Sequence, residues 1–168
     1  MVLSLISKQK YLSELLVQKA IDTRKKLAVA ESCTGGMISS TLTSIPRSSE
    51  IFDQGLVTYS NKSKIDLLKV QERTLSIHGA VSKEVVEEMV KGLFKISVAD
   101  LALSISGVAG PGSISTTKPE GLVWIGYGLR NQIIHTSKFD IKPLGRDYVR
   151  EKSTIEALNL LLKSLEIL

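Results

Sequence analysis

The sequence predicts an α/β protein, namely a three-layer α/β/α sandwich around a mostly parallel or mixed sheet. Three observations predict it. Helical patterns alternate with strand-like segments over the first two-thirds of the chain, the early strands are short and wholly apolar, and an antiparallel strand pair follows. Wholly apolar strands must be covered by helices on both faces of the sheet. A chain of 168 residues can bury one sufficient core, so we expect a single domain over 1–168.

The first half of the chain alternates helix and strand. Apolar residues at helical spacing predict a helix over 8–21, with Leu12, Leu15, Leu16 and Ala20 facing the core. Short apolar runs and a glycine-rich turn predict the next elements, which are a buried strand over 27–30, a turn over 31–36, a helix over 37–44 and a strand over 51–59.

The second half begins with a polar turn predicted at 60–63. The clearest helix pattern starts after Ser82, a good N-cap residue, and its apolar positions recur as far as Phe94. The other predicted elements are short helical pieces over 64–76, a strand over 101–105, antiparallel strands over 122–127 and 133–139, and a last helix from Gly145 with Ile155, Leu158, Leu161, Leu162 and Leu165 inward.

Composition and charge exclude several classes of protein. No apolar stretch reaches the roughly 20 residues of a membrane helix, and no signal peptide is recognisable, so we expect a cytoplasmic protein without a membrane partner. The single cysteine, Cys33, and the distant His78 and His135 suit neither a disulfide nor a zinc site, so we expect no metal. The net charge of +5 is dispersed and aromatic residues make up 5%, which favours a small anionic ligand over nucleic acid. A homo-oligomer, first of all a dimer, is expected from its frequency among soluble enzymes.

The corner after the first strand carries polar groups that could do chemistry. Ser32, Cys33 and Thr34 stand there beside Gly35 and Gly36, whose backbone N–H groups could bind an anion. A nucleophile or an anion cradle would suit this corner, and an ordinary helix cap explains the hydroxyls as well. A catalytic thiol is the weaker interpretation of Cys33, because no histidine stands in a recognisable partner position.

Three further segments are candidates. Lys62 and Lys64 follow Tyr59 in a polar segment. Either lysine could be a base only if burial or a neighbouring cation lowered its pKa by about 3 units; otherwise both are surface charges. Ser106, Gly107 and Gly110 belong to a glycine-rich segment that either receives a ligand or is an ordinary loop. The fourth candidate, Arg146, could grip a phosphate, or could pair with Asp147 or Glu151 on the helix surface.

These segments, in this order and at these separations, resemble the CinA C-terminal domain family. The matching pieces are Ala-Glu-Ser-Cys-Thr-Gly-Gly at 30–36, Tyr-Ser-Asn at 59–61 with Lys64, His-Gly-Ala-Val-Ser at 78–82, and Ser-Gly-Val-Ala-Gly-Pro-Gly at 106–112 with Lys118, Pro119 and Gly121. The resemblance implies an α/β sandwich in a stand-alone form, without the N-terminal domain of larger family proteins.

The resemblance also implies an activity, the hydrolysis of nicotinamide mononucleotide to nicotinic acid mononucleotide and ammonia. Ser32 would be the nucleophile, Lys64 its base, and Tyr59 a member of the same hydrogen-bonded group, with no cofactor. The oxyanion would be held by backbone N–H groups of the turn after Ser32. The nucleotide would be bound by residues of the turn, of the glycine-rich segment and of the last helix, namely Thr34, Gly35, Gly36, Ser106, Gly107, Gly110 and Arg146, the last as a partner for the phosphate.

Three positions depart from the usual family pattern. Arg47 and Ser113 stand where family members often have Gly, and Glu120 stands where they have a small apolar residue. A carboxylate facing the pocket would repel a phosphate. These departures keep open a catalytically silent nucleotide-binding protein, and the family's historical name keeps open an accessory role in DNA uptake or damage response.

Overall fold

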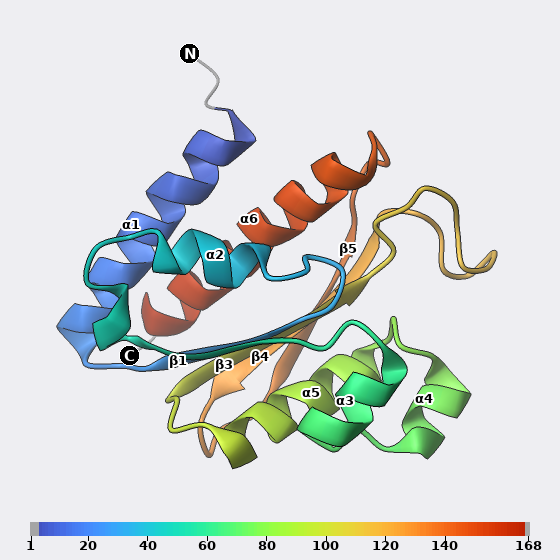
Figure 1. Cartoon of the computed structure of the whole chain (residues 1–168), viewed down its shortest axis with the longest axis horizontal. Helices are drawn as coiled ribbons and strands as arrows, with labels where there is room; N and C mark the ends of the chain where they lie inside the picture. The colour runs from blue at the N-terminus through green and yellow to red at the C-terminus, as the bar shows by residue number, and fades with distance from the viewer. Residues whose placement is uncertain (1–3, 167–168) are drawn as a thin grey trace.

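Figure 1 shows the computed structural model, which describes residues 4–166. Within that range five strands form one sheet in the order β2-β1-β3-β4-β5. Their bounds are β1 (Leu27–Glu31), β2 (Phe52–Val57), β3 (Leu101–Gly107), β4 (Leu122–Leu129) and β5 (His135–Asp140). β1 pairs in parallel with β2 and β3, whereas β4 is antiparallel to both β3 and β5. The mixed sheet predicted from the sequence is confirmed.

Helices cover both faces of the sheet and make the three predicted layers (Figure 1). One face carries α1 (Leu5–Thr23), α2 (Met37–Thr43) and α6 (Arg146–Glu166), and the other carries α3 (Asn61–Leu68), α4 (Glu72–His78) and α5 (Lys83–Ile96). A single 3-10 turn, Ser48–Glu50, precedes β2. None of the helices in the described part of the chain is both long enough and apolar enough to cross a membrane.

The central strand β1 explains why two cores form. All of its residues are buried. Leu27 and Val29 join the core under α1, α2 and α6, whereas Ala28 and Ala30 join the core under α5. Side chains alternate between the faces of a strand, so one apolar run contributes side chains to both cores. The small alanines on the second face leave room for α5 to approach the sheet.

The helix α5 also fixes the position of α3. Gly92 lies in the middle of α5, and a Cβ added there would overlap the backbone carbonyl of Leu68 at the end of α3. Glycine lowers helix stability, yet here it allows the backbones of two helices to meet. The same contact packs α3 against α5.

Two sequence predictions are wrong in detail. Leu15 is 43% exposed, because the buried stripe of α1 runs through Leu12, Leu16 and Ala20 with Val17, and Leu15 lies beside that stripe. Residues 60–63 are not a turn. Ser60 is the N-cap of α3 and the following residues form its first helical turn.

Other element boundaries also differ from the predictions. β3 continues through Ser106 and Gly107, β5 begins only at His135, and the helical pieces predicted over 64–76 are the end of α3 and most of α4. The predicted Ser82 cap is confirmed, since its Oγ accepts a hydrogen bond from the Val85 amide at 3.4 Å. The antiparallel pairing of the last two strands is also confirmed.

Candidate active site

The corner between β1 and α2 is fixed by a buried carboxylate. Glu31 ends β1, and its two oxygens accept hydrogen bonds from the amides of Gly36, Ile38 and Ser39 at 3.0, 3.1 and 2.8 Å. The Ser39 hydroxyl donates a fourth at 2.7 Å. The N-cap of α2 is Gly36, which has no side chain to supply this cap. Glu31 therefore satisfies the free amides of the helix and places negative charge at the positive end of its dipole.

Ser32 lies between this cap and the neighbouring strand. Its amide donates to the carbonyl of Ile105 in β3 at 3.0 Å. Its hydroxyl accepts a hydrogen bond from Nζ of Lys64 at 3.1 Å, and its side chain is buried. The backbone on either side of Ser32 is held, so its hydroxyl has a defined position relative to Lys64.

Lys64 is fully buried, which is rare for a lysine. Besides Ser32, its Nζ donates to the backbone carbonyls of Thr58 at 2.7 Å and Tyr59 at 3.2 Å. No acidic side chain among residues 4–166 forms an ion pair with it. Burial without a counter-charge disfavours the ammonium form, and it lowers the pKa of Lys64 from 10.5 to about 8.

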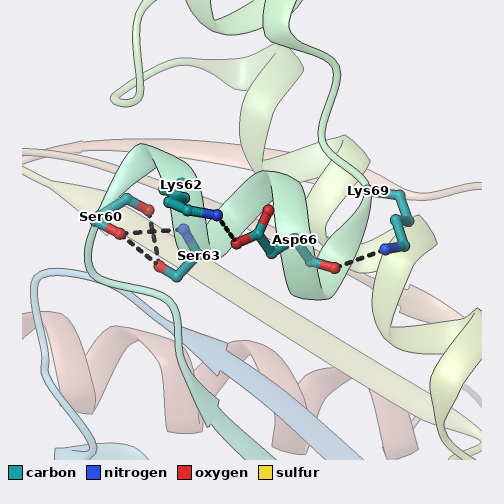
Figure 2. Close-up of polar contacts among 5 residues, drawn as sticks. All are labelled: Ser60, Lys62, Ser63, Asp66 and Lys69. Atoms are coloured by element: carbon teal, nitrogen blue, oxygen red, sulfur yellow. Dashed lines mark hydrogen bonds and ion pairs between the residues drawn. The ribbon is translucent and has the colours of Figure 1, made fainter.

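Helical periodicity separates Lys64 from Lys62. Figure 2 shows the first turns of α3, where Ser60 caps Ser63 and the side chain of Lys62 runs along the helix surface to Asp66. The Lys62 side chain is 82% exposed. Lys64 follows two positions later on the opposite, inward side of the helix. The surface interpretation left open by the sequence therefore holds for Lys62 and fails for Lys64.

Tyr59 and Arg146 lie together at the mouth of the site. The Tyr59 side chain is exposed, and its hydroxyl accepts a hydrogen bond from Nη2 of Arg146 at 3.0 Å. Nη1 of Arg146 donates to the carbonyl of Gly110 at 2.6 Å. Tyr59 reaches Lys64 through its backbone carbonyl, whereas its phenol contacts Arg146. The start of α6 is thereby tied to two segments that are distant in the sequence.

The surface ion pair weighed for Arg146 belongs to another arginine. Arg150 approaches Asp147 at 3.8 Å, and its Nη2 donates to the carbonyl of Thr34 at 2.9 Å. Sequence reasoning missed Arg150, which supports the turn after Ser32 from the second turn of α6. Its one sequence signal is the spacing of four residues from Arg146, which places both on one side of the helix.

A cavity of about 170 Å³ opens above Ser32 and Lys64. The predicted site residues that line it are Ser32, Tyr59, Lys64, Ser106, Gly107 and Arg146. Four other predicted residues are not in its lining, namely Thr34, Gly35, Gly36 and Gly110. Sequence reasoning missed four apolar or weakly polar lining residues, namely Ala80, Val81, Ala109 and Ile114, because an apolar wall carries no chemical signature.

The glycine-rich segment meets the cavity with Ser106, Gly107 and Ala109. The Ser106 hydroxyl donates to the carbonyl of Ala80 at 2.8 Å, which ties β3 to the segment before α5. A Cβ on Gly107 would lie 2.8 Å from Cγ2 of Val123 and 3.1 Å from the sulfur of Cys33. Packing alone therefore requires a glycine at 107.

The amides of the turn after Ser32 differ in their partners. The amide of Gly36 is bonded to Glu31, and that of Gly35 to the Ser32 carbonyl at 3.1 Å. The amides of Cys33 and Thr34 have no oxygen acceptor among residues 4–166. Burial raises the pKa of the Cys33 thiol to about 12, so the thiol is neutral at physiological pH.

The three departures from the family pattern lie outside the cavity lining. Arg47 pairs with Glu50 at 2.7 Å on the surface before β2. Glu120 accepts a hydrogen bond from the amide of Gly112 at 2.8 Å, and its own amide donates to the Ser113 hydroxyl at 3.2 Å. Both residues brace the loop between β3 and β4. No three His, Cys, Asp or Glu side chains gather as metal ligands in the described part of the chain.

Comparison with known proteins identifies relatives over nearly the whole chain. A profile of the CinA C-terminal domain matches residues 9–165. The chain is 41% identical over 155 residues to a putative competence-damage inducible protein of Caldicellulosiruptor bescii, and 44% identical over 155 residues to a CinA-like protein of Thermotoga maritima. Each match covers 92% of this chain but 37% of the relative, so the chain spans just over a third of the length of these proteins.

Solved structures match the whole architecture. A crystal structure of a competence/damage inducible protein from Agrobacterium tumefaciens has a TM-score of 0.91 and 34% identity, and covers 95% of this chain and 96% of that one. A CinA superfamily protein from Klebsiella pneumoniae has a TM-score of 0.91 and 31% identity, and the match covers 95% and 99% of the two chains.

Proposed function

This chain belongs to the CinA C-terminal domain family, and on that premise we propose that it is an amidohydrolase that converts nicotinamide mononucleotide to nicotinic acid mononucleotide and ammonia. One observation carries the proposal. Nζ of a fully buried lysine, Lys64, lies 3.1 Å from the hydroxyl of Ser32, and both groups line one cavity. A hydroxyl beside an amine of lowered pKa is the arrangement that an activated serine nucleophile needs.

The first half of the reaction forms an acyl-enzyme. With a pKa of about 8, about a tenth of Lys64 is neutral at pH 7 and can accept a proton. Lys64 takes the proton of the Ser32 hydroxyl as the serine oxygen attacks the carboxamide carbon. The amide of Cys33, which lines the cavity, stabilises the resulting oxyanion. When the tetrahedral intermediate collapses, Lys64 returns the proton to the leaving nitrogen and ammonia departs.

The second half releases the acid. A water molecule gives a proton to Lys64 and attacks the acyl carbon, and the C–O bond to Ser32 breaks as Lys64 returns the proton to the serine oxygen. The product is the carboxylic acid of the pyridine nucleotide. Every proton passes through one amine, so these steps use no group beyond this chain and water.

The cavity suits the carboxamide end of the substrate. Its volume is about 170 Å³, whereas sites for whole drug-sized ligands measure roughly 300 Å³ or more. The pyridine ring therefore enters with its amide toward Ser32, against the apolar wall of Val81 and Ala109. Tyr59 and Arg146 contact the bound nucleotide from the mouth of the cavity.

The silent nucleotide-binding alternative rested on Arg47, Ser113 and Glu120. All three lie outside the cavity lining, and the acidic one is bonded within its own loop. These positions give no reason to expect a damaged site, so the amidase is the better-supported function.

Ammonia release from nicotinamide mononucleotide tests the proposal. The wild-type protein should release ammonia, and Ser32→Ala should lower the rate by at least about a thousandfold, because the nucleophile is gone. Ser76→Ala, an exposed serine of α4, is the matched control and should retain full activity. Full turnover by Ser32→Ala, with unchanged thermal stability, would show that the mechanism is wrong.

A further inference from the structure

A second cavity, of about 420 Å³, lies beside the first. The two cavities share Val81 as a wall, and the segment His78–Ser82 and the loop between β3 and β4 contribute lining to both. Figure 1 shows this loop projecting beyond the end of the sheet. A ligand that leaves the first cavity over Val81 would enter the second.

Three lysines from three different elements line the second cavity. Lys83 comes from the first turn of α5, Lys118 from the loop and Lys138 from β5. Lys83 forms no ion pair with any residue of 4–166. Lys138 approaches Asp140 at 3.4 Å, and both side chains are at least half exposed, so this pair is weak. Segments far apart in the sequence thus bring cations to one hollow.

The lining of the second cavity holds more cationic than anionic side chains, namely three lysines and one glutamate. The one acidic lining residue, Glu84, approaches Nδ1 of His78 at 3.5 Å. Lys118 donates to the carbonyl of His78 and so braces the wall between the cavities. Lys83 and Lys138 are the two lining lysines whose side chains can turn toward a ligand.

The floor of the second cavity is apolar. Trp124 and Leu122 of β4 lie there, packed with Val81 and Val108 in a small separate cluster. An aromatic ring beside exposed cations offers a surface for a sugar and donors for a phosphate. Trp124 is the only tryptophan of the chain, so its fluorescence reports on this cavity alone.

From these contacts we infer that the second cavity binds the phosphate end of the nucleotide whose carboxamide occupies the first cavity, with Lys83 and Lys138 as the phosphate ligands. This inference rests on the proposed function. The first cavity is too small for a whole nucleotide, and Arg146 at its mouth already donates to Tyr59 and Gly110. The lysines across Val81 can therefore bind the phosphate, whereas the guanidinium of Arg146 already has other acceptors.

Tryptophan fluorescence tests this inference independently of turnover. Ribose 5-phosphate, nicotinamide mononucleotide and nicotinamide riboside are titrated into the wild type and into Ser32→Ala, which prevents hydrolysis. The test variant is Lys83→Gln with Lys138→Gln. Its matched control is Lys8→Gln with Lys10→Gln, which removes the same charge from exposed positions of α1 on the opposite face of the sheet.

We expect both phosphorylated ligands to change the Trp124 signal, and the riboside to do so at least about tenfold more weakly, because it lacks the charge-assisted hydrogen bonds. The test variant should lose this preference, and its KM for the nucleotide should rise more than its kcat falls. The control variant should bind like the wild type.

The outcomes separate this inference from the proposed function. Binding of ribose 5-phosphate at Trp124 without any ammonia release would refute the amidase and leave the phosphate site standing. Ammonia release with equal KM values for the wild type and the test variant would overturn the phosphate site. A loss of nucleotide preference in Arg146→Gln but not in the lysine variant would assign the phosphate to the mouth and also overturn it.

Discussion

At the residue scale the site depends on the burial of one lysine. The corner after the first strand predicted only a group of candidates, because an ordinary helix cap explained its hydroxyls as well, and the family resemblance singled out Ser32 among them. Lys64 could not be chosen over Lys62 from residue type, since most lysines are exposed. The difference lies in which side of α3 each occupies, and that depended on a helix start that the sequence pattern placed too late.

The stability of the protein should report the burial of Lys64. The pKa of Lys64 is about 8 in the folded state, against a usual 10.5, so between these pH values the unfolded chain binds more protons than the folded one. The free energy of unfolding should therefore rise with pH across this window, by up to about 3 kcal/mol from this group. Urea denaturation at pH 7 and pH 10 measures the rise.

The comparison that isolates this effect is Lys64→Met, which keeps an unbranched side chain and removes the titrating amine. The difference in unfolding free energy between wild type and variant should shift in favour of the wild type as the pH rises. A difference that stays constant from pH 7 to pH 10 would mean that the amine titrates normally in the folded protein.

Glu31 is the residue that sequence analysis most clearly missed. Its signal was an acidic residue at the end of a buried strand, just before a helix whose N-cap is a glycine. A buried carboxylate needs partners, and the uncapped amides of such a helix supply them. The other missed residues, such as Val81 and Ile114, are ordinary apolar side chains that only the three-dimensional fold brings to the cavity.

At the element scale, α2 and the corner before it should depend on this carboxylate. Glu31→Gln keeps the shape but replaces one accepting oxygen by an NH2 donor that faces the donors of α2, so the free energy of unfolding should fall by about 1–3 kcal/mol. Turnover should fall as well, because Ser32 follows directly on this residue. Urea denaturation and ammonia release measure the two effects.

The matched control for this substitution is Glu50→Gln. Glu50 is about half exposed and pairs with Arg47 on the surface, so its loss should leave both stability and turnover close to those of the wild type. Equal effects of the two substitutions would contradict the capping role of Glu31.

The position of α3 should depend on Gly92 of α5, which contacts it. Alanine normally stabilises a helix relative to glycine by about 1 kcal/mol. Gly92→Ala should instead destabilise the protein by about 1–3 kcal/mol, because the added methyl would overlap the carbonyl of Leu68. Thermal denaturation of Gly92→Ala measures the effect, with Lys95→Ala, a substitution at an exposed position of the same helix, as the control. A stabilised Gly92→Ala would show that α3 and α5 are less closely packed.

At the scale of the whole molecule, the site follows from the direction of the strands. β1, β2 and β3 are parallel, so their carboxyl ends meet at one edge and bring together Ser32, Tyr59 and Ser106. The alternation of helix and strand predicted this layered class. The order of the strands and the return of α6 over the mouth were not predicted, because they depend on contacts between residues distant in the sequence.

The dependence of ammonia release on pH tests the central claim most directly, namely that neutral Lys64 activates Ser32. With nicotinamide mononucleotide as substrate, kcat/KM should rise about tenfold per pH unit below pH 8 and level off above it, because the pKa of Lys64 is about 8. Lys64→Met should be inactive throughout. A kcat/KM that is flat from pH 6 to pH 9, or substantial turnover by Lys64→Met, would contradict the account.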